Sequence, residues 1–243
     1  IAFPEIWTPL LTKVLNSAAK GNIPPSWATS IIFPIFKKGD KAPPECYRPI
    51  SLIDSVVNVL GRTLLNRLRT LAEGWGGVSA LQYGFRPRLG TVDQCINLDL
   101  LINKYTVGKV GSLQLAFMDL SSVFDCVNRA KIWAILELMG IDANLGWFIR
   151  ALHRDMRGVV RFNSDGCCTK EFRIQSRVHQ GCILAPFLFA LYINGLDHYL
   201  LQFKPDSLRV GGGGEGLPLP INHNKRGLLP PNLYFDAEAC GGG

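Results

Sequence analysis

Two short stretches, about sixty residues apart, decide the fold of this chain. Residues 117–125 read Phe-Met-Asp-Leu-Ser-Ser-Val-Phe-Asp, and residues 178–186 read Val-His-Gln-Gly-Cys-Ile-Leu-Ala-Pro. The first stretch places the carboxylate of Asp119 at the end of an apolar β run, with an aromatic residue five positions later. The second is a Gln-Gly turn followed by an apolar segment, and Pro186 near its start is typical of the first turn of a helix. The pair predicts a strand that ends at a carboxylate and a helix that follows a glycine turn.

The spacing of apolar residues over the rest of the chain predicts further helices and strands. Pro34 lies within the first predicted strand, and because proline has no N–H to donate we expect that strand at the edge of a sheet. Thr91 with Gln94 resembles a capping box at the start of a helix. Helices alternate with strands, some of them antiparallel, which indicates an α+β fold with a mixed or antiparallel sheet packed with helices. The predicted helices are 5–20, 53–71, 91–105, 128–139, 144–156 and 184–201, and the predicted strands are 29–36, 112–120, 159–162 and 172–174.

Composition and charge limit what the chain can be and what it can bind. Of its 243 residues 47% are hydrophobic, which is enough to form a core in one large domain or two smaller ones. The net charge is +7, and residues 1–90 carry eleven Lys and Arg against five Asp and Glu, a local excess of +6. A basic region suggests a polyanionic partner, because phosphate contacts supply most sequence-independent affinity, although a solvated basic surface has the same composition.

Several functional classes lack their sequence signatures here. The seven cysteines, an odd number without any C-x-x-C pair, imply neither a disulfide framework nor a zinc site. No apolar run reaches the roughly 18–20 residues of a membrane span, so we expect no membrane partner. Reduced thiols fit an intracellular protein, either cytoplasmic or nuclear. Ile1 begins mid-pattern with no initiator Met and no signal peptide, which suggests a piece of a longer protein.

The two opening stretches resemble motifs A and B of the reverse transcriptases (RNA-directed DNA polymerases) of non-LTR, or LINE-type, retrotransposons. The string Leu-Phe-Ala-Leu-Tyr-Ile-Asn at 188–194 continues the resemblance after motif B. Earlier blocks resemble the fingers region of these enzymes and the block that follows it. They are Ile-Pro-x-x-Trp at 23–27, Pro-Ile-Phe-Lys-Lys-Gly-Asp at 34–40, Tyr-Arg-Pro-Ile-Ser-Leu at 47–52 and Gln-x-Gly-Phe-Arg at 82–86.

The resemblance implies polymerase fingers and a partial palm, with no thumb. Residues 1–110 would be the fingers-like region, and residues 111–204 would be the palm with motifs A and B. In residues 205–243, runs of glycine and scattered prolines break all periodicity, so we expect an irregular tail. Within it the string Leu-Tyr-Phe-Asp-Ala at 233–237 resembles a degenerate motif C, which in the family reads Tyr-Ala-Asp-Asp.

The resemblance also implies a metal site built from oxygen ligands. Asp119 and Asp236 would be the catalytic carboxylates and would bind Mg²⁺, with Mn²⁺ as an alternative, and Leu120 would add its backbone carbonyl. Mg²⁺ suits these groups because it is a hard cation that takes carboxylate oxygens and substrate phosphates. Metal ions in such sites hold the attacking and leaving oxygens during phosphoryl transfer.

Further residues would bind the incoming nucleotide, again by resemblance. Phe124 would lie beneath the sugar and exclude a ribose 2′-OH by bulk. Arg48 would grip the triphosphate, since a guanidinium can pair with a phosphate through two hydrogen bonds. The remaining nucleotide-binding candidates are Lys37 and Lys38, for the triphosphate, and Gln180 and Gly181, for the nucleotide or the template.

The function implied is two-metal transfer of dNTPs onto a DNA primer on an RNA template, by a truncated and partly degenerate domain. Val123, Ala185 and Ala237 stand where the family usually has Ala, Ser and Asp. Two alternatives stay open: a non-catalytic nucleic-acid-binding remnant, and a translated retrotransposon pseudogene fragment. The sequence also leaves open whether this chain is itself an active enzyme, and what its oligomeric state is.

Overall fold

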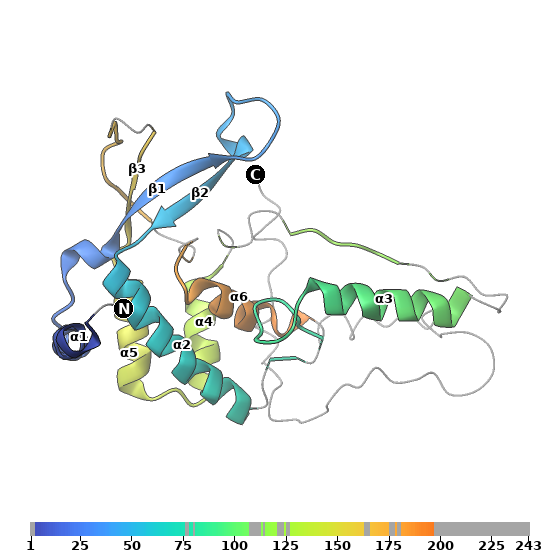
Figure 1. Ribbon diagram of the computed structural model, residues 1–243, viewed down its shortest axis with the longest axis horizontal. Coiled ribbons are helices and arrows are strands. Elements are labelled where there is room, and N and C mark those ends of the chain that lie inside the picture. Colours follow the sequence, from blue (N-terminus) through green and yellow to red (C-terminus); the bar gives the residue numbers. More distant parts are fainter. Residues whose placement is uncertain are drawn as a thin grey trace.

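The computed structural model describes most of the chain up to residue 196. A two-stranded hairpin rises from a layer of packed helices, and a further helix, α3 (Thr91–Thr106), extends to one side (Figure 1). This arrangement confirms the α+β fold that the sequence predicts. The described residues are 3–75, 78–79, 81–106, 113, 115–120, 124, 127–162, 166–174, 178 and 181–196.

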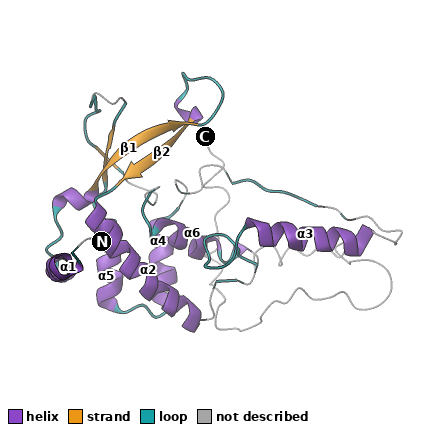
Figure 2. Cartoon of the chain, in the orientation of Figure 1, coloured by secondary structure: helices purple, strands orange, loops and turns teal. Residues whose placement is uncertain are grey.

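The α-helices fall in three runs along the chain, separated by two pairs of strands (Figure 2). In chain order the elements are α1 (Pro4–Ala19), the 3₁₀ turn η1 (Pro25–Ala28), β1 (Thr29–Phe36), the 3₁₀ turn η2 (Pro44–Cys46), β2 (Tyr47–Leu52), α2 (Ser55–Trp75), α3, α4 (Arg129–Leu138), α5 (Ala143–Leu152), β3 (Arg157–Val160), β4 (Phe172–Arg173) and α6 (Ala185–Ile193). Each predicted helix has a counterpart, so the apolar periodicity located the helices correctly.

The strands of the described residues form one mixed sheet in the order β2–β1–β3–β4. β1 and β2 pair antiparallel, with Ile31 opposite Leu52, whereas β1 and β3 run parallel. β4 returns antiparallel to β3, so the strands predicted at 159–162 and 172–174 pair with each other as a hairpin. The predicted mixed sheet is therefore confirmed as well.

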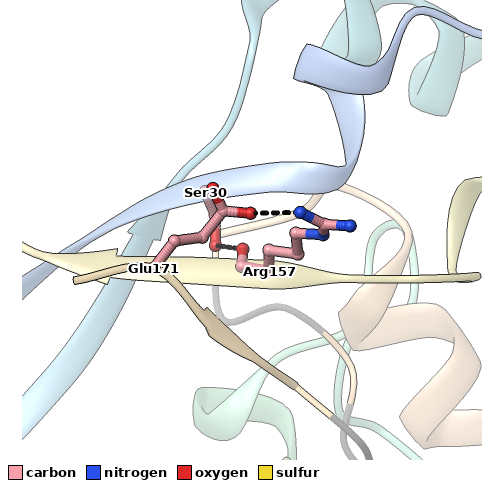
Figure 3. A network of polar contacts seen from close by, with 3 residues as sticks. All are labelled: Ser30, Arg157 and Glu171. Carbon is pink, nitrogen blue, oxygen red and sulfur yellow. Dashed lines mark hydrogen bonds and ion pairs between the residues drawn. The ribbon is translucent and has the colours of Figure 1, made fainter.

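Polar contacts reinforce the junction of β1 with β3 (Figure 3). Buried Ser30, through Oγ, donates to the carbonyl of Arg157 at 3.2 Å, and Arg157 pairs with Glu171 at 2.9 Å. A Cβ on Gly158 would lie 2.8 Å from Ile32 Cδ1, so a side chain there would require Ile32 to shift. The Ser30–Arg157 bond joins residues 127 positions apart, so β1 and β3, which are distant in sequence, are neighbours in one sheet.

The prediction that Thr29–Phe36 is an edge strand is wrong, because β1 lies between β2 and β3. Pro34 is opposite Pro49 in β2, so the two prolines occupy the same position of the ladder. The carbonyl of Ile32 accepts from Arg161 N–H at 2.9 Å on the β3 side. In a strand the N–H and C=O groups of successive residues point to opposite sides, so the backbone groups of Pro34 point to the same side as those of Ile32. β3 has already ended at that position. The missing N–H therefore removes no ladder hydrogen bond.

The main hydrophobic core lies among α2, α4, α5 and α6. Leu64 and Leu68 bury one face of α2, which confirms the apolar stripe predicted over 53–71. α6 is buried at seven of its nine positions, and Leu188 and Tyr192 are almost inaccessible to solvent. A helix that is apolar all round is stable only when other elements surround it, so α6 is the central helix of the layer.

Capping side chains explain where three helices begin. Asn128 and Asp142 each accept hydrogen bonds from two backbone N–H groups in the first turns of α4 and α5. α3 begins at the predicted Thr91, but Asp93 rather than Gln94 reaches back and accepts from Gly90 N–H at 2.7 Å. The capping interaction is thus shifted by one residue relative to the predicted capping box.

α5 ends at Leu152 rather than at the predicted residue 156. Asp155 adopts a left-handed backbone conformation with φ of 51°, which turns the chain out of the helix. Met156 then packs with Ile32 and Ile174 in a second, small core beneath the sheet. Its apolar side chain continues the helical pattern in sequence, but it belongs to the sheet rather than to α5.

The predicted buried strand over 112–120 is wrong for the residues that the structure describes there. The described residues 113 and 115–120 form no strand (Figure 2). Phe117 in this run is 82% exposed. An apolar β run becomes a strand only where a neighbouring strand satisfies its backbone groups, and none of the four strands of the described sheet pairs with this run. The string at 233–237, which resembles a degenerate motif C, lies outside the described residues.

α3 buries none of its side chains, although Val92, Ile96 and Leu100 repeat at helical spacing. The helix extends away from the core along its whole length (Figure 1). Among the described residues, no helix combines the length and apolar character needed to cross a membrane.

Candidate active site

The glycine of the Gln-Gly turn lies directly against strand β2. Gly181 has a φ of 118°, a conformation that L side chains rarely adopt, and a Cβ at this position would collide with the carbonyl oxygen of Ser51. Glycine is therefore required here both by backbone conformation and by space. The contact joins motif B to the block at 47–52, two regions that the sequence separates by about 130 residues.

Three phenylalanines from three different sequence blocks form one aromatic cluster. Phe124 lies 5.4 Å from Phe189 of α6 and 6.3 Å from Phe85, measured between ring centroids, and Phe85 and Phe189 are 6.5 Å apart. The carbonyl of Phe124 also accepts from Val178 N–H at 3.3 Å. Tilted and edge-on rings at these distances attract each other beyond simple burial, so motif A, motif B and the block at 82–86 are packed together.

The loop that carries Phe85 is tied down by hydrogen bonds at its start. Asn194, at the end of α6, accepts from Ser79 N–H through Oδ1 at 2.6 Å. Arg86 donates to the carbonyls of Ser79, at 3.0 Å, and Gln82, at 3.4 Å. Phe85 itself has a positive φ of 61°, which is uncommon for a bulky residue and directs its ring onto Phe124.

The first catalytic candidate, Asp119, is exposed and stands at the margin of the core. The next residue, Leu120, packs against the main core and is half-buried, as Phe124 is. The carboxylate of Asp119 is thus in contact with solvent, whereas the apolar residues that follow it in the chain pack against the core. Gln180 and Asp236 lie outside the described residues, and no group of three or more His, Cys, Asp or Glu within the described part could hold a metal ion.

The structure brings the three cationic candidates onto one hairpin. Lys37 follows β1, where its N–H donates to the carbonyl of Cys46 at 2.8 Å and its Nζ reaches the carbonyl of Glu45 at 3.5 Å. Lys38 comes next in the turn and is exposed. Arg48 lies on β2 opposite Ile35, with its side chain exposed. All three cations are available to a polyanion, as their proposed role requires.

Comparison with known proteins identifies the class to which this fold and these motifs belong. A family profile described as reverse transcriptase (RNA-dependent DNA polymerase) matches residues 35–210, so the chain belongs to the reverse transcriptase family. Enzymes of this family generally use divalent metal ions, nucleotides and a nucleic-acid template with its primer.

The relatives are polymerases of mobile elements, which confirms the resemblance to non-LTR retrotransposon enzymes. The RNA-directed DNA polymerase from mobile element jockey of Drosophila melanogaster is 34% identical over 203 residues, covering 79% of this chain and 21% of the relative. The Pol polyprotein of type-1 retrotransposable element R2 of Popillia japonica is 27% identical over 202 residues, covering 82% and 27%. The probable polymerase from transposon X-element of Drosophila melanogaster is 29% identical over 189 residues, covering 75% and 20%. The chain thus spans about a fifth to a quarter of the length of these relatives.

Sequence reasoning missed the contacts that hold the blocks together. Phe85 and Phe189 belong to strings that resemble family blocks, but nothing in their spacing indicates that they meet Phe124. Asn194 closes the string after motif B, but its bond to Ser79 joins residues 115 positions apart. A polar residue at the end of an otherwise apolar helix was the available signal for that role.

Proposed function

We propose that this chain supplies the nucleotide site of an RNA-directed DNA polymerase, which adds dNTPs to a DNA primer on an RNA template. The observation that carries the proposal is the packing of Phe124 against Phe85 and Phe189, since it unites three family blocks around one residue. The contact of Gly181 with Ser51 joins the motif B turn to strand β2, which carries Arg48. A chain with only scattered strings that resemble the family, and without the shared fold, would not be expected to make these contacts.

In this proposal Phe124 is the wall that selects deoxyribose. Its ring is backed by Phe189, which is only 6% exposed and belongs to the buried central helix. A wall with such backing cannot easily move aside for an additional hydroxyl group, because packed cores resist displacement. Gly181 would hold the backbone of the motif B turn against β2 and beside the nucleotide, and Gln180 would contact the nucleotide or the template.

The cations of the hairpin would bind the triphosphate of the incoming nucleotide. Arg48 would pair with phosphate oxygens through two hydrogen bonds, and Lys37 and Lys38 would add charge. Lys37 is bonded only to backbone carbonyls in the described residues, so no carboxylate there competes for its charge. The exposed positions of all three fit a ligand that arrives from solvent.

The divalent ion of the family would be Mg²⁺, with Mn²⁺ as an alternative. Asp119 fits a hard cation because its carboxylate is exposed and next to a fixed backbone carbonyl, that of Leu120. Asp236 would be the second carboxylate. When bound, the ions stabilise the charge that develops on the transferred phosphoryl group.

The domain division follows the same proposal. Residues 1–110 would be the fingers-like region, residues 111–204 the palm, and residues 205–243 an irregular tail with a degenerate motif C. The first two regions would not be independent bodies, because β1 and β3 belong to one sheet. A nucleotide held by both would therefore meet a single framework.

The proposal is tested by primer extension on an RNA template in the presence of Mg²⁺. The chain is assayed both as it stands and with residues 205–243 replaced by a segment that carries an intact Tyr-Ala-Asp-Asp motif and a thumb. The completed chain should extend the primer, and Asp119→Asn should abolish extension. If the completed chain binds primer and template but adds no nucleotide, the polymerase proposal fails.

A second candidate function is a nucleic-acid-binding remnant without chemistry. The observation in its favour is that residues 115–120, which carry Asp119, have no strand partner in the described sheet. RNA binding that weakens with salt and is indifferent to Asp119→Ala, without any extension by the completed chain, would support it.

A further inference from the structure

A pocket of about 510 Å³ lies between α4 and α5, on residues that none of the proposed polymerase roles uses. Its volume is within the roughly 300–1,000 Å³ typical of ligand sites. It shares no residue with the aromatic cluster of Phe85, Phe124 and Phe189, or with the Gly181–Ser51 contact. The pocket is lined by Arg129, Trp133, Trp147, Arg150, Ala151, His153, Arg154 and Asp155.

The charge of the lining is mainly positive. Three guanidinium groups face one lining carboxylate, Asp155. Arg150 is paired with Glu137 outside the pocket, whereas Arg154 is exposed and makes no ion pair within the part of the chain that the structure describes. Arg154 is therefore the cation most available to an anionic ligand.

The aromatic part of the lining offers flat surface at the same place. Trp147 is 47% exposed, so its ring is accessible, and it stacks on Phe148 with 14° between the two ring planes. Trp133 is half-buried and meets the ring of His153 edge-on, 5.6 Å between centroids. The pocket thus places two indole rings beside the guanidinium of Arg154. A basic surface that contacted only water would not need these rings.

The floor of the pocket is rigid. His153 is buried and its Nδ1 lies 2.8 Å from the carbonyl of Ile149, while its own carbonyl accepts from Arg129 at 2.6 Å. Arg129 also donates to the carbonyl of Ile174 beside β4, at 3.4 Å. These bonds tie α4, α5 and the sheet together, so a ligand would meet a preformed site and lose little affinity to ordering.

We propose that this pocket binds an unpaired nucleic-acid strand, with a base against Trp147 and a phosphate on Arg154, at a site separate from the polymerase site. Proteins that bind single strands combine positive charge with aromatic rings, because the charge attracts the backbone and every base has a face that can stack. A free phosphate would use the guanidinium groups but not the indoles. An acidic peptide would likewise leave both indoles without a flat partner.

The test measures binding of an eight-nucleotide RNA and of the same DNA sequence to the full chain, in EDTA and without primer or dNTP. Under these conditions failure of polymerase chemistry does not affect the readout. Arg154→Ala should weaken binding several-fold and lower the slope of log affinity against log salt by about one, and Trp147→Leu should weaken it about tenfold. Equal losses for RNA and DNA are expected, since stacking and phosphate contacts do not depend on the 2′-OH.

Matched controls separate this site from general basicity. Trp7→Leu changes a tryptophan of almost the same exposure, 48%, on α1, and Arg67→Ala removes an exposed arginine from α2. Both controls should bind as the unmodified chain does. Binding by Trp147→Leu and Arg154→Ala that matches the two controls would overturn the proposal. A second result would also overturn the proposal: inorganic pyrophosphate displaces the RNA completely, and does so equally well from the unmodified chain and from Trp147→Leu. The pocket would then recognise phosphate alone.

Discussion

The α carbon of Gly181 packs so closely on the carbonyl of Ser51 that no side chain can stand between them. This single contact sets the position of the motif B turn relative to β2, and through β2 relative to Arg48 three residues earlier. It also explains why glycine is required at a turn with φ of 118°.

Gly181→Ala should disturb both stability and nucleotide binding. The added methyl group meets backbone, which cannot rotate away, and overpacking of this kind costs roughly 1–3 kcal/mol of unfolding free energy. Urea unfolding followed by circular dichroism measures the loss. Gly74→Ala is the matched control, because a Cβ there has nothing within 4 Å and alanine favours the helix. Equal unfolding free energies for the two variants would contradict the assigned contact.

The aromatic cluster makes a graded prediction for two of its members. Phe189→Ala should cost about 3–5 kcal/mol of unfolding free energy, since the residue is buried in the central helix. Phe85→Ala should cost clearly less, because that ring is 48% exposed. Both variants remove a neighbour of Phe124 and should weaken the discrimination between dNTP and rNTP. A Phe85→Ala variant as unstable as Phe189→Ala would show that the loop, rather than α6, supports the cluster.

Stability should fall as the pH drops below about 6.5, in part because of His153. Burial lowers the pKa of His153, which favours the neutral ring in the folded state, and the charge of Arg129 lowers it further. The unfolded chain therefore binds more protons than the folded chain in this pH range. The stabilisation that His153 contributes is complete above its unfolded pKa and is lost as the pH falls toward its folded pKa. Chemical unfolding at pH 7.5 and 5.5 measures the change.

His153→Gln keeps a donor for the carbonyl of Ile149 but does not titrate. Its loss of stability between pH 7.5 and 5.5 should be smaller than that of the unmodified chain. An identical loss in both proteins would assign the pH dependence to other groups.

The sequence predicted local structure well wherever the cause is local. The stripe on α2 and the helices that begin near residues 128 and 144 depend on residues within one or two turns of each other. The β3–β4 hairpin was predictable for the same reason. Family strings added the candidate site residues, whose roles stay proposals.

Long-range pairing is what the sequence could not supply. Pro34 indicated an edge strand, but the parallel pairing of β1 with a segment 127 residues away overrides that signal. The run ending at Asp119 has strand composition, yet no strand in the described sheet pairs with it. In both cases the outcome depends on which distant backbone is adjacent, a fact that composition does not encode.

The most direct test of the central claim, that Phe124 and its aromatic neighbours form the nucleotide site of a reverse transcriptase, is sugar discrimination. Incorporation of one dNTP and of the matching rNTP on an RNA template is measured for the completed chain and for its Phe124→Val variant. The account predicts a strong preference for the dNTP that falls by about tenfold or more in the variant, as expected when a pocket loses steric bulk. Unchanged discrimination in Phe124→Val, with polymerisation intact, would contradict it.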